Sequence, residues 1–200
     1  GVQVASYQGN SFYKGNDGKM RCYDKNGNLI KNQFVCDGTY TYYFQADGTA
    51  MTDRLTYHPD GVHVIYLDAN GHEVFSNFTN VKKSIAGTPV DDLCFFDVHG
   101  YMYVDVVTFD QTGKKLYYAN QYGVMERKGW FKFSPKQGGG TGYANTDGTL
   151  KVNQFAKDAQ GRDVYFKGDG RLATGLITDG AYYYRMDETD GHCIEKYPVK

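Results

Sequence analysis

Residues 41–52, which read TYYFQADGTAMT, contain the pattern that decides the fold. An aromatic run from Tyr42 to Phe44 is followed by an Asp-Gly dipeptide at Asp47 and Gly48. A short aromatic run predicts a β-strand, and Asp-Gly is a dipeptide typical of tight hairpin turns. We therefore expect a strand and a turn from this segment.

The same pattern recurs from one end of the 200-residue chain to the other. Eight copies each end in a turn glycine, and the separations between these glycines run from 21 to 29 residues. The turn glycines are Gly27, Gly48, Gly71, Gly100, Gly123, Gly148, Gly170 and Gly191. A fixed period of this size is the sequence signature of a repeat architecture.

Two further features define the repeat unit. A second glycine lies about ten residues before most of the turn glycines, so each unit carries two turns. Six of the eight turn glycines follow Asn or Asp, which predicts type I′ hairpin turns with positive φ at both central residues. The residue seven positions after each turn glycine is apolar in seven of eight units; these residues are Phe34, Leu55, Phe78, Val107, Trp130, Phe155, Ile177 and, as the exception, Pro198.

Composition agrees with an all-β fold. The chain has 19 Tyr and 12 Phe but only 8 Leu, and its acidic residues are 19 Asp and 4 Glu. Asp favours turns, so a helical bundle is excluded, and the leucine count excludes leucine-rich repeats. Because a lone hairpin is marginal in water, we expect a β-solenoid of stacked β-hairpin repeats in which neighbouring units bury the aromatic row.

The repeat is least regular in the middle of the chain. We divide the array into N-terminal hairpin repeats at 1–80, irregular central repeats at 81–137 and C-terminal hairpin repeats at 138–200. The insertion from Lys82 to Pro89 is predicted to form a surface loop, and the glycine-rich segment from Gly138 to Gly142 a flexible linker. The array is either continuous or interrupted in this middle part.

Charge and hydropathy exclude several partners. The 22 basic and 23 acidic residues are interspersed, which argues against nucleic acid. Purely apolar runs are about four residues long, so membrane insertion is not expected. The chain begins at Gly1, and we interpret it as a piece of a longer, processed protein.

No catalytic, cofactor or metal site is predicted. His58 and His63 flank a turn without a third ligand in register, and no cysteine has a recognisable base partner. Cys22 and Cys36 flank one turn, so they either meet across neighbouring strands or are buried as small apolar residues. We therefore expect that the chain is not an enzyme.

The repeat resembles the cell-wall-binding repeat family on two quoted stretches, residues 31–35 (KNQFV) and 41–52. This family includes choline-binding repeats of pneumococcal surface proteins, glucan-binding repeats of glucansucrases and repetitive domains of clostridial toxins. The resemblance implies a β-solenoid on a secreted or cell-surface protein of a Gram-positive bacterium. It also implies ligand pockets between successive repeats and attachment to a larger enzyme or surface protein.

One departure from the choline-binding members bears on the ligand. Those members use tryptophans at the seventh position in an aromatic cage, whereas this chain has a tryptophan there only at Trp130. The pairs Gln33-Phe34 and Gln154-Phe155 are similar to the glucan-binding branch. The resemblance therefore favours a polysaccharide partner over choline.

We expect a non-catalytic carbohydrate-binding module for an α-glucan such as starch or dextran, bound by aromatic stacking between repeats. A cell-wall anchor or host-surface adhesin without glucan specificity is the alternative. Most of the 32 rings are needed for the core, and the remainder are expected at repeat junctions. The predicted ligand-binding residues are Trp130, Tyr118, Gln33, Tyr43, Gln154 and Tyr165.

Overall fold

The computed structural model describes all 200 residues and consists of eighteen short β-strands and one 3-10 turn. The strands up to residue 103 are β1 (Val2–Tyr7), β2 (Asn10–Lys14), β3 (Met20–Tyr23), β4 (Gln33–Cys36), β5 (Thr41–Phe44), β6 (Arg54–Tyr57), β7 (Val64–Leu67), β8 (Asn77–Ile85) and β9 (Thr88–Phe96). The elements that follow are β10 (Val106–Phe109), β11 (Leu116–Ala119), β12 (Gly129–Lys132), η1 (Pro135–Gln137), β13 (Thr141–Ala144), β14 (Gln154–Lys157), β15 (Asp163–Phe166), β16 (Gly175–Thr178), β17 (Tyr182–Met186) and β18 (Cys193–Pro198).

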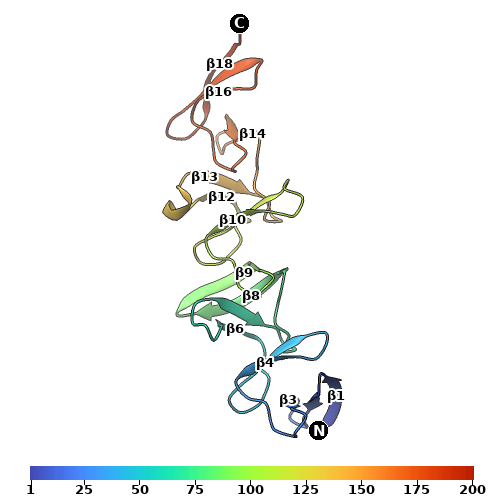
Figure 1. The fold of residues 1–200 in the computed structure, drawn as a ribbon. Coiled ribbons are helices and arrows are strands. Elements are labelled where there is room, and N and C mark those ends of the chain that lie inside the picture. Colours follow the sequence, from blue (N-terminus) through green and yellow to red (C-terminus); the bar gives the residue numbers. More distant parts are fainter. The chain divides into compact units, whose positions relative to one another are not determined.

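The strands form eight small antiparallel sheets, one for each predicted repeat unit (Figure 1). Six are two-stranded hairpins such as β4–β5, and the sheets β1–β2–β3 and β16–β17–β18 have three strands. The predicted all-β class is confirmed. No helix in the chain is long or apolar enough to cross a lipid bilayer.

The chain divides into two compact units, Gly1–Tyr103 and Val104–Lys200. The boundary between them falls inside the segment 81–137, where the sequence repeat is least regular. Each unit contains four of the eight sheets.

The geometry of the Asn-Gly and Asp-Gly turns differs from the prediction. Gly27 has φ of 80°, but Asn26 is not among the residues with positive φ, so the type I′ assignment is wrong here. Asp24 explains the difference, because its Oδ1 accepts hydrogen bonds of 2.9 Å from the backbone N–H groups of both Asn26 and Asn28. These bonds hold the turn in a conformation in which only the glycine needs positive φ.

Positive φ at both central turn residues occurs elsewhere in the chain. Gln8 and Gly9 have φ of 51° and 84° between β1 and β2, and Ala86 and Gly87 have 49° and 79° between β8 and β9. These two hairpins lack the Asn-Gly or Asp-Gly dipeptide. The tight pairing of the flanking strands therefore selects this turn without the favoured residues.

A left-handed residue stands at every junction between successive hairpins, a feature not predicted from the sequence. It reverses the chain just before, or at, the first residue of the next strand. The seven residues are Asn32, Asp53, Ser76, Asp105, Gly129, Asn153 and Gly175, with φ between 47° and 91°. Asn, Asp and Gly tolerate this conformation best, so Ser76 is the least suitable member of the set.

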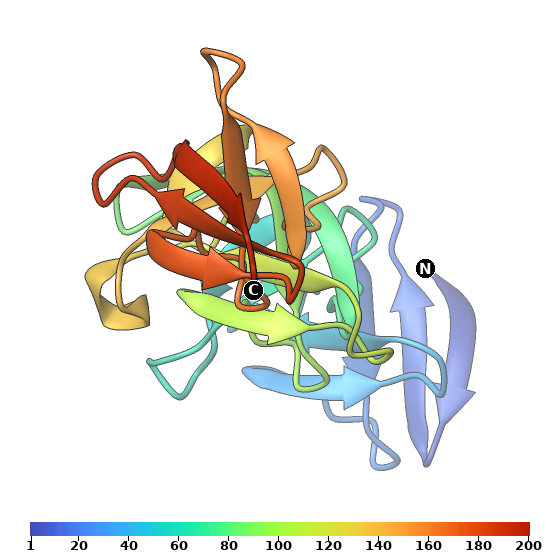
Figure 2. The same ribbon diagram turned by 90° about the horizontal axis from the view of Figure 1, so that it is seen from above.

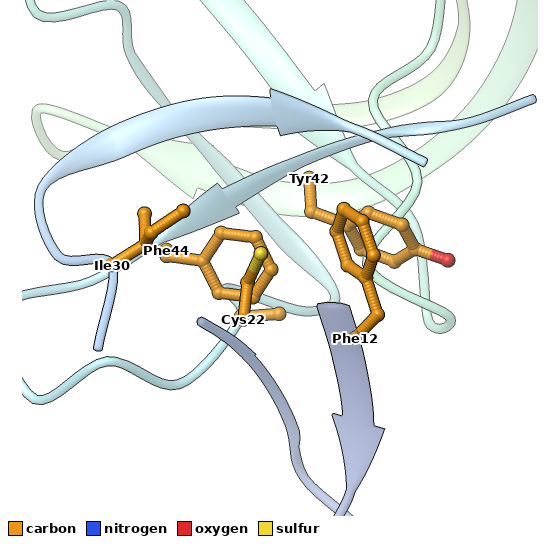
Figure 3. Packing of buried hydrophobic residues seen from close by; sticks show 6 residues of the cluster. Phe12, Cys22, Ile30, Tyr42 and Phe44 are labelled. Carbon is orange, nitrogen blue, oxygen red and sulfur yellow. The ribbon is translucent and has the colours of Figure 1, made fainter. Parts of the chain in front are cut away.

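Buried side chains of the second strand of each hairpin contribute to the core. In β5, Tyr42 and Phe44 are buried and pack against Phe12 at centroid separations of 6.0 and 6.1 Å. Figure 3 shows Tyr42 beside the Phe12 ring and Cys22 beside the Phe44 ring. Rings from two neighbouring sheets thus make one cluster, which neither sheet forms alone.

Backbone hydrogen bonds also join neighbouring sheets inside each compact unit. In each case the amide just after a turn glycine donates to a carbonyl in or beside a strand of the preceding sheet. The bonds are Ala50 N to Met20 O, Glu73 N to Thr41 O, Met102 N to Val64 O, Leu150 N to Leu116 O and Leu172 N to Thr141 O, at 2.8–2.9 Å. They fix the register of one hairpin on the next.

The insertion from Lys82 to Pro89 was expected to form a loop, and this expectation is wrong. These residues extend the hairpin, so β8 and β9 pair continuously from Asn77 with Phe96 to Ile85 with Thr88. Alternate burial along both strands, including Val81 and Val90, provides the reason, because a paired strand with one buried face is more stable than an exposed loop.

The segment from Gly138 to Gly142 is not a flexible linker. Ser134 caps η1, the short coil visible in Figure 2, and Gly138 takes φ of 88° at the end of that turn. Arg171 donates hydrogen bonds to the carbonyls of Gly139, at 3.0 Å, and Gln137, and its guanidinium lies 4.2 Å from the Phe133 ring centroid. A side chain distant in sequence therefore fixes this loop.

All four cysteines are free. Cys22 and Cys94 are buried, and burial raises the pKa of the Cys94 thiol to about 12. Cys36 is exposed, so Cys22 and Cys36 are neither joined nor both buried.

Substitution of Ser76 tests the role of the left-handed junction residue. Ser76 is exposed and has φ of 47°, so Ser76→Gly removes backbone strain and should stabilise the chain by about 0.5–1.5 kcal/mol in chemical denaturation. Ser84 is also exposed but lies in β8, so Ser84→Gly should destabilise by about 0.5–1 kcal/mol. Equal effects of the two substitutions would contradict this role.

Glu73 occupies a position that is apolar in the six other units with the same backbone bridge. Its counterparts are Leu29, Ala50, Met102, Met125, Leu150 and Leu172. The carboxylate packs beside Gly100 and Phe75, and burial raises the pKa of Glu73 to about 7. The folded state therefore favours the neutral acid.

Stability should fall as pH rises from about 4.5 through 7, because the folded chain must then ionise Glu73. Glu73→Gln should stabilise the chain by about 1–2 kcal/mol at pH 8 and by much less at pH 5. Denaturation at both pH values measures this. Glu188→Gln, at an exposed site, serves as the control and should show no such pH-dependent gain; a Glu73→Gln gain that is the same at both pH values would refute the assignment.

Candidate functional site: cross-strand aromatic pairs

In seven of the eight units, the residue at the seventh position after the turn glycine lies directly opposite a ring of the next strand; the exception is Pro198, which lies opposite Tyr182 of the preceding strand. The pairs are Phe34–Tyr43, Leu55–Tyr66, Phe78–Phe95, Val107–Tyr118, Trp130–Tyr143, Phe155–Tyr165 and Ile177–Tyr184. Opposite residues in an antiparallel pair share one face of the sheet. The two sequence rows, strand aromatic and seventh residue, are thus one structural feature.

The chemical type of the seventh residue decides whether the pair is accessible. Where it is aliphatic, the opposite tyrosine is buried; we call Leu55–Tyr66, Val107–Tyr118 and Ile177–Tyr184 the closed pairs. Where it is aromatic, the opposite ring remains half-buried; we call Phe34–Tyr43, Phe78–Phe95, Trp130–Tyr143 and Phe155–Tyr165 the open pairs.

Each closed-pair tyrosine donates its hydroxyl proton to an aspartate. Tyr118 donates to Asp105 Oδ1 at 2.7 Å, Tyr184 to Asp179 Oδ2 at 2.7 Å, and Tyr66 to Asp53 Oδ1 at 3.2 Å. The bond to Asp179, together with burial, raises the pKa of Tyr184 to about 12. These hydroxyls are satisfied inside the protein, so the closed pairs have a structural role.

The open pairs have a shared geometry. Ring centroids are 4.8 Å apart in Phe34–Tyr43, in Phe78–Phe95 and in Phe155–Tyr165, and 5.4 Å apart in Trp130–Tyr143. The ring planes cross at 54–85°, so one ring presents its edge to the other. Phe78, Trp130 and Phe155 remain 37%, 41% and 41% exposed.

A third ring packs against each open pair. His58 stacks on Phe34 at 5.4 Å, and Tyr103 lies 4.9 Å from Phe95. Phe166 lies 5.5 Å from Trp130, and Tyr184 lies 4.9 Å from Phe155. Each open pair is therefore part of a corner of three packed rings, and one ring of the pair is at least 37% exposed in every case except Phe34–Tyr43, which packs against a core cluster.

Two of these corners already hold a lysine over a ring. The Lys151 ammonium lies 5.2 Å from the centroid of Tyr143, and that of Lys196 lies 5.6 Å from the centroid of Tyr184. A ring face attracts one cation through its quadrupole, so a bound quaternary ammonium would compete with these side chains. A neutral ring such as a pyranose carries no positive charge and so is not repelled by these lysines.

The six predicted ligand-binding residues lie in different environments in the structure. Trp130, Tyr43 and Tyr165 belong to open pairs, whereas Tyr118 is 1% exposed and its ring has no face available to a ligand. Gln33 is exposed and lines a cavity of about 360 Å³ with Phe34. The Gln154 amide donates to the Val152 carbonyl at 3.3 Å, within its own chain segment.

Five further rings of the open pairs were not among the predicted ligand-binding residues: Phe34, Phe78, Phe95, Tyr143 and Phe155. Their signal was present, because an aromatic residue at the seventh position marks every open pair and an aliphatic one every closed pair. In the sequence alone, aromatic and aliphatic residues at that position look like one uniform apolar row.

The densest group of potential metal ligands is Asp187, Asp190 and His192, whose ligand atoms lie within 4.8 Å of one another. Turn hydrogen bonds explain this group, because Asp187 Oδ1 accepts from the backbone N–H of Asp190 at 3.0 Å. Arg162 also donates to Asp190 Oδ2 at 3.0 Å, which places a cation beside the group. We therefore assign these residues to the turn.

Two curated relatives match most of the chain. Glucosyltransferase-I of Streptococcus downei is 30% identical over 176 residues, which cover 86% of the chain and 9% of the relative. Glucosyltransferase-S of Streptococcus mutans is 30% identical over 179 residues, which cover 80% of the chain and 12% of the relative. The chain thus spans about a tenth of each enzyme. No protein-family model matches the chain.

Two solved structures share the fold. The choline-binding domain of CbpL from Streptococcus pneumoniae has a TM-score of 0.60 and 23% identity, over 95% of the chain and 87% of that domain. Choline binding protein F from the same species has a TM-score of 0.58 and 17% identity, over 96% of the chain and 80% of that protein. Together with the repeated hairpins and their aromatic pairs, the sequence matches show that the chain belongs to the choline- and glucan-binding repeat family, and the two solved structures share its fold.

Proposed function

We propose that the chain is a non-catalytic carbohydrate-binding module whose ligand is an α-glucan such as dextran or starch. The observation that carries the proposal is the set of four open pairs, each a half-exposed aromatic corner. A pyranose has an apolar face that stacks on such rings while its hydroxyls bond to water and nearby polar groups. Both curated relatives are, by name, enzymes that transfer glucosyl groups.

We further propose that the hairpins of each compact unit stack as a short β-solenoid. The repeated backbone bonds, such as Glu73 N to Thr41 O and Leu172 N to Thr141 O, support this arrangement. It would place one open pair after another along the chain. A polymer that contacts several weak sites then binds with greater avidity than any single site provides.

The module would act as part of a larger secreted or cell-surface protein, as the small share of each relative that it matches suggests. Its role there would be to hold the polymer or the cell wall near the rest of that protein. A cell-wall anchor or adhesin without glucan specificity is the second candidate. The choline-binding names of the structural neighbours support it.

Trp130→Ala tests the glycan site. It removes the largest stacking face, and we expect affinity for a dextran or amylose oligosaccharide to fall about five- to tenfold, which corresponds to about 1–1.4 kcal/mol. Isothermal titration measures this, and thermal melting verifies that the variant is folded. Tyr122→Ala is the matched control, because Tyr122 is 56% exposed and lies in a turn outside every pair.

Three outcomes separate the alternatives. A selective loss with Trp130→Ala supports the module, whereas equal affinities of wild type and variant would remove Trp130 from the site. If the wild type binds neither dextran nor amylose, the anchor or adhesin takes precedence.

Gln33→Ala and Gln154→Ala, tested in parallel, should reduce affinity less, because these amides offer only hydrogen bonds that water also makes.

Choline should neither bind tightly nor stabilise the chain. The ammonium groups of Lys151 and Lys196 already lie over rings of two open-pair corners, and only one pair contains a tryptophan. We expect the melting temperature to stay within about 1 °C in millimolar choline. A larger rise with choline that is absent with its neutral isostere 3,3-dimethylbutanol would contradict this prediction.

A further inference from the structure

The Phe155–Tyr165 open pair opens onto a cavity whose walls carry several charged side chains. The cavity has a volume of about 540 Å³ and is lined by the rings of Phe155 and Tyr184 together with residues of β14, β15 and β18. This volume suits a ligand of one or two sugar rings. The inference drawn from this cavity rests on the proposed carbohydrate-binding function and specifies the kind of sugar bound.

The floor of the cavity is aromatic. Phe155 is 41% exposed and is held between Tyr165, at a centroid distance of 4.8 Å, and Tyr184, at 4.9 Å. Both neighbours pack against the Phe155 ring, and its exposed part offers a platform for a pyranose.

The charges around this platform are mostly paired. Lys157 Nζ lies 2.5 Å from Asp163 Oδ1, and Arg162 binds both Asp158, at 2.9 Å, and Asp190, at 3.0 Å. The Glu195 carboxylate lies 3.5 Å from Arg185 Nε. Both carboxylates in the wall, Asp163 and Glu195, therefore already have a basic partner. Two of the three cations, Lys157 and Arg162, likewise already have a carboxylate partner.

Lys196 is the exception. It lies directly opposite Tyr184 in the β17–β18 register, and its ammonium sits 4.1 Å from the Tyr182 ring centroid and 5.6 Å from that of Tyr184. Ring faces hold it in place but do not neutralise its charge. A positive charge fixed at the edge of an aromatic platform attracts an acidic group attached to a ring that stacks there.

We infer that this cavity binds an acidic sugar, with the pyranose stacked on Phe155 and its carboxylate or phosphate bound by Lys196. The neighbouring Lys157 and Arg162 are held in position by their own carboxylate partners, which leaves Lys196 as the unpaired cation of the wall. Uronic acids and sugar phosphates share this chemistry, and the experiment below distinguishes a carboxylate from a phosphate ligand.

The test uses three monosaccharides with the same ring, namely glucose, glucuronic acid and glucose 6-phosphate. Nuclear magnetic resonance titration of the whole chain in low salt measures each dissociation constant. We expect at least one acidic sugar to bind about fivefold or more tightly than glucose, and the preference should shrink at 0.5 M salt because the contact is ionic and exposed. The stronger of the two acids identifies carboxylate or phosphate as the preferred group.

Lys196→Gln should abolish the preference, so that neither acidic sugar binds more tightly than glucose. Lys167→Gln is the matched control, since it makes the same charge change at an exposed residue of the same compact unit that does not line the cavity. Melting curves verify that both variants are folded. Phe155→Leu should weaken the binding of all three sugars, because it removes the aromatic platform.

The outcomes distinguish this inference from the proposed function. If glucose or an α-glucan binds but the acidic sugars gain nothing, the acidic-sugar inference is overturned and the glycan-binding module stands. A preference that survives Lys196→Gln likewise overturns it. If neither the sugars nor the glucans bind to the wild type, both proposals fail.

Discussion

A two-stranded hairpin has one face to bury and nothing of its own to bury it against, and the architecture of this chain follows from that constraint. Each hairpin buries apolar side chains of its second strand, and clusters of these side chains join neighbouring hairpins. The Phe12, Tyr42 and Phe44 cluster is the clearest case, because its rings come from two sheets (Figure 3). Backbone bonds such as Ala50 N to Met20 O then fix the register between sheets.

The same constraint separates structural rings from rings available for binding. An aliphatic residue opposite the strand tyrosine leaves that tyrosine buried, with its hydroxyl bound to an aspartate, as in Val107–Tyr118 and Asp105. An aromatic residue in that place leaves a half-exposed corner of rings, as in Trp130–Tyr143. An aromatic instead of an aliphatic residue at the seventh position thus changes a buried pair into a partly exposed one. The abundance of Tyr and Asp has a common origin in the closed pairs and the turns.

Much of the fold was accessible from the sequence because glycine spacing and aromatic runs are local signals. The eight units, their boundaries near the turn glycines and the lack of helices follow from such signals. The turn type was wrong because the side chain of Asp24 binds two backbone amides, a competition that the Asn-Gly dipeptide does not reveal. The left-handed residues at the junctions, including Ser76, have no common side chain and so no visible motif.

The candidate site was predicted less completely, for reasons that lie in long-range packing. Trp130, Tyr43 and Tyr165 lie in open pairs, but Tyr118 is buried, because it packs against Phe131 and Phe133 of the next hairpin in a core cluster. Which tyrosine of a consecutive run faces inward depends on strand register, and the sequence leaves that register open. The loop at Gly138–Gly142 is fixed by Arg171, some thirty residues away, and no local pattern announces that contact.

The central claim is that seventh-position aromatics create binding sites and seventh-position aliphatics do not. Nuclear magnetic resonance of the aromatic side chains during titration with an α-glucan oligosaccharide tests it in one measurement. The account predicts shifts for the rings of Phe34, Phe78, Trp130 and Phe155, and none for Tyr66 and Tyr118. Shifts centred on Tyr66 or Tyr118, with the open pairs unaffected, would contradict it.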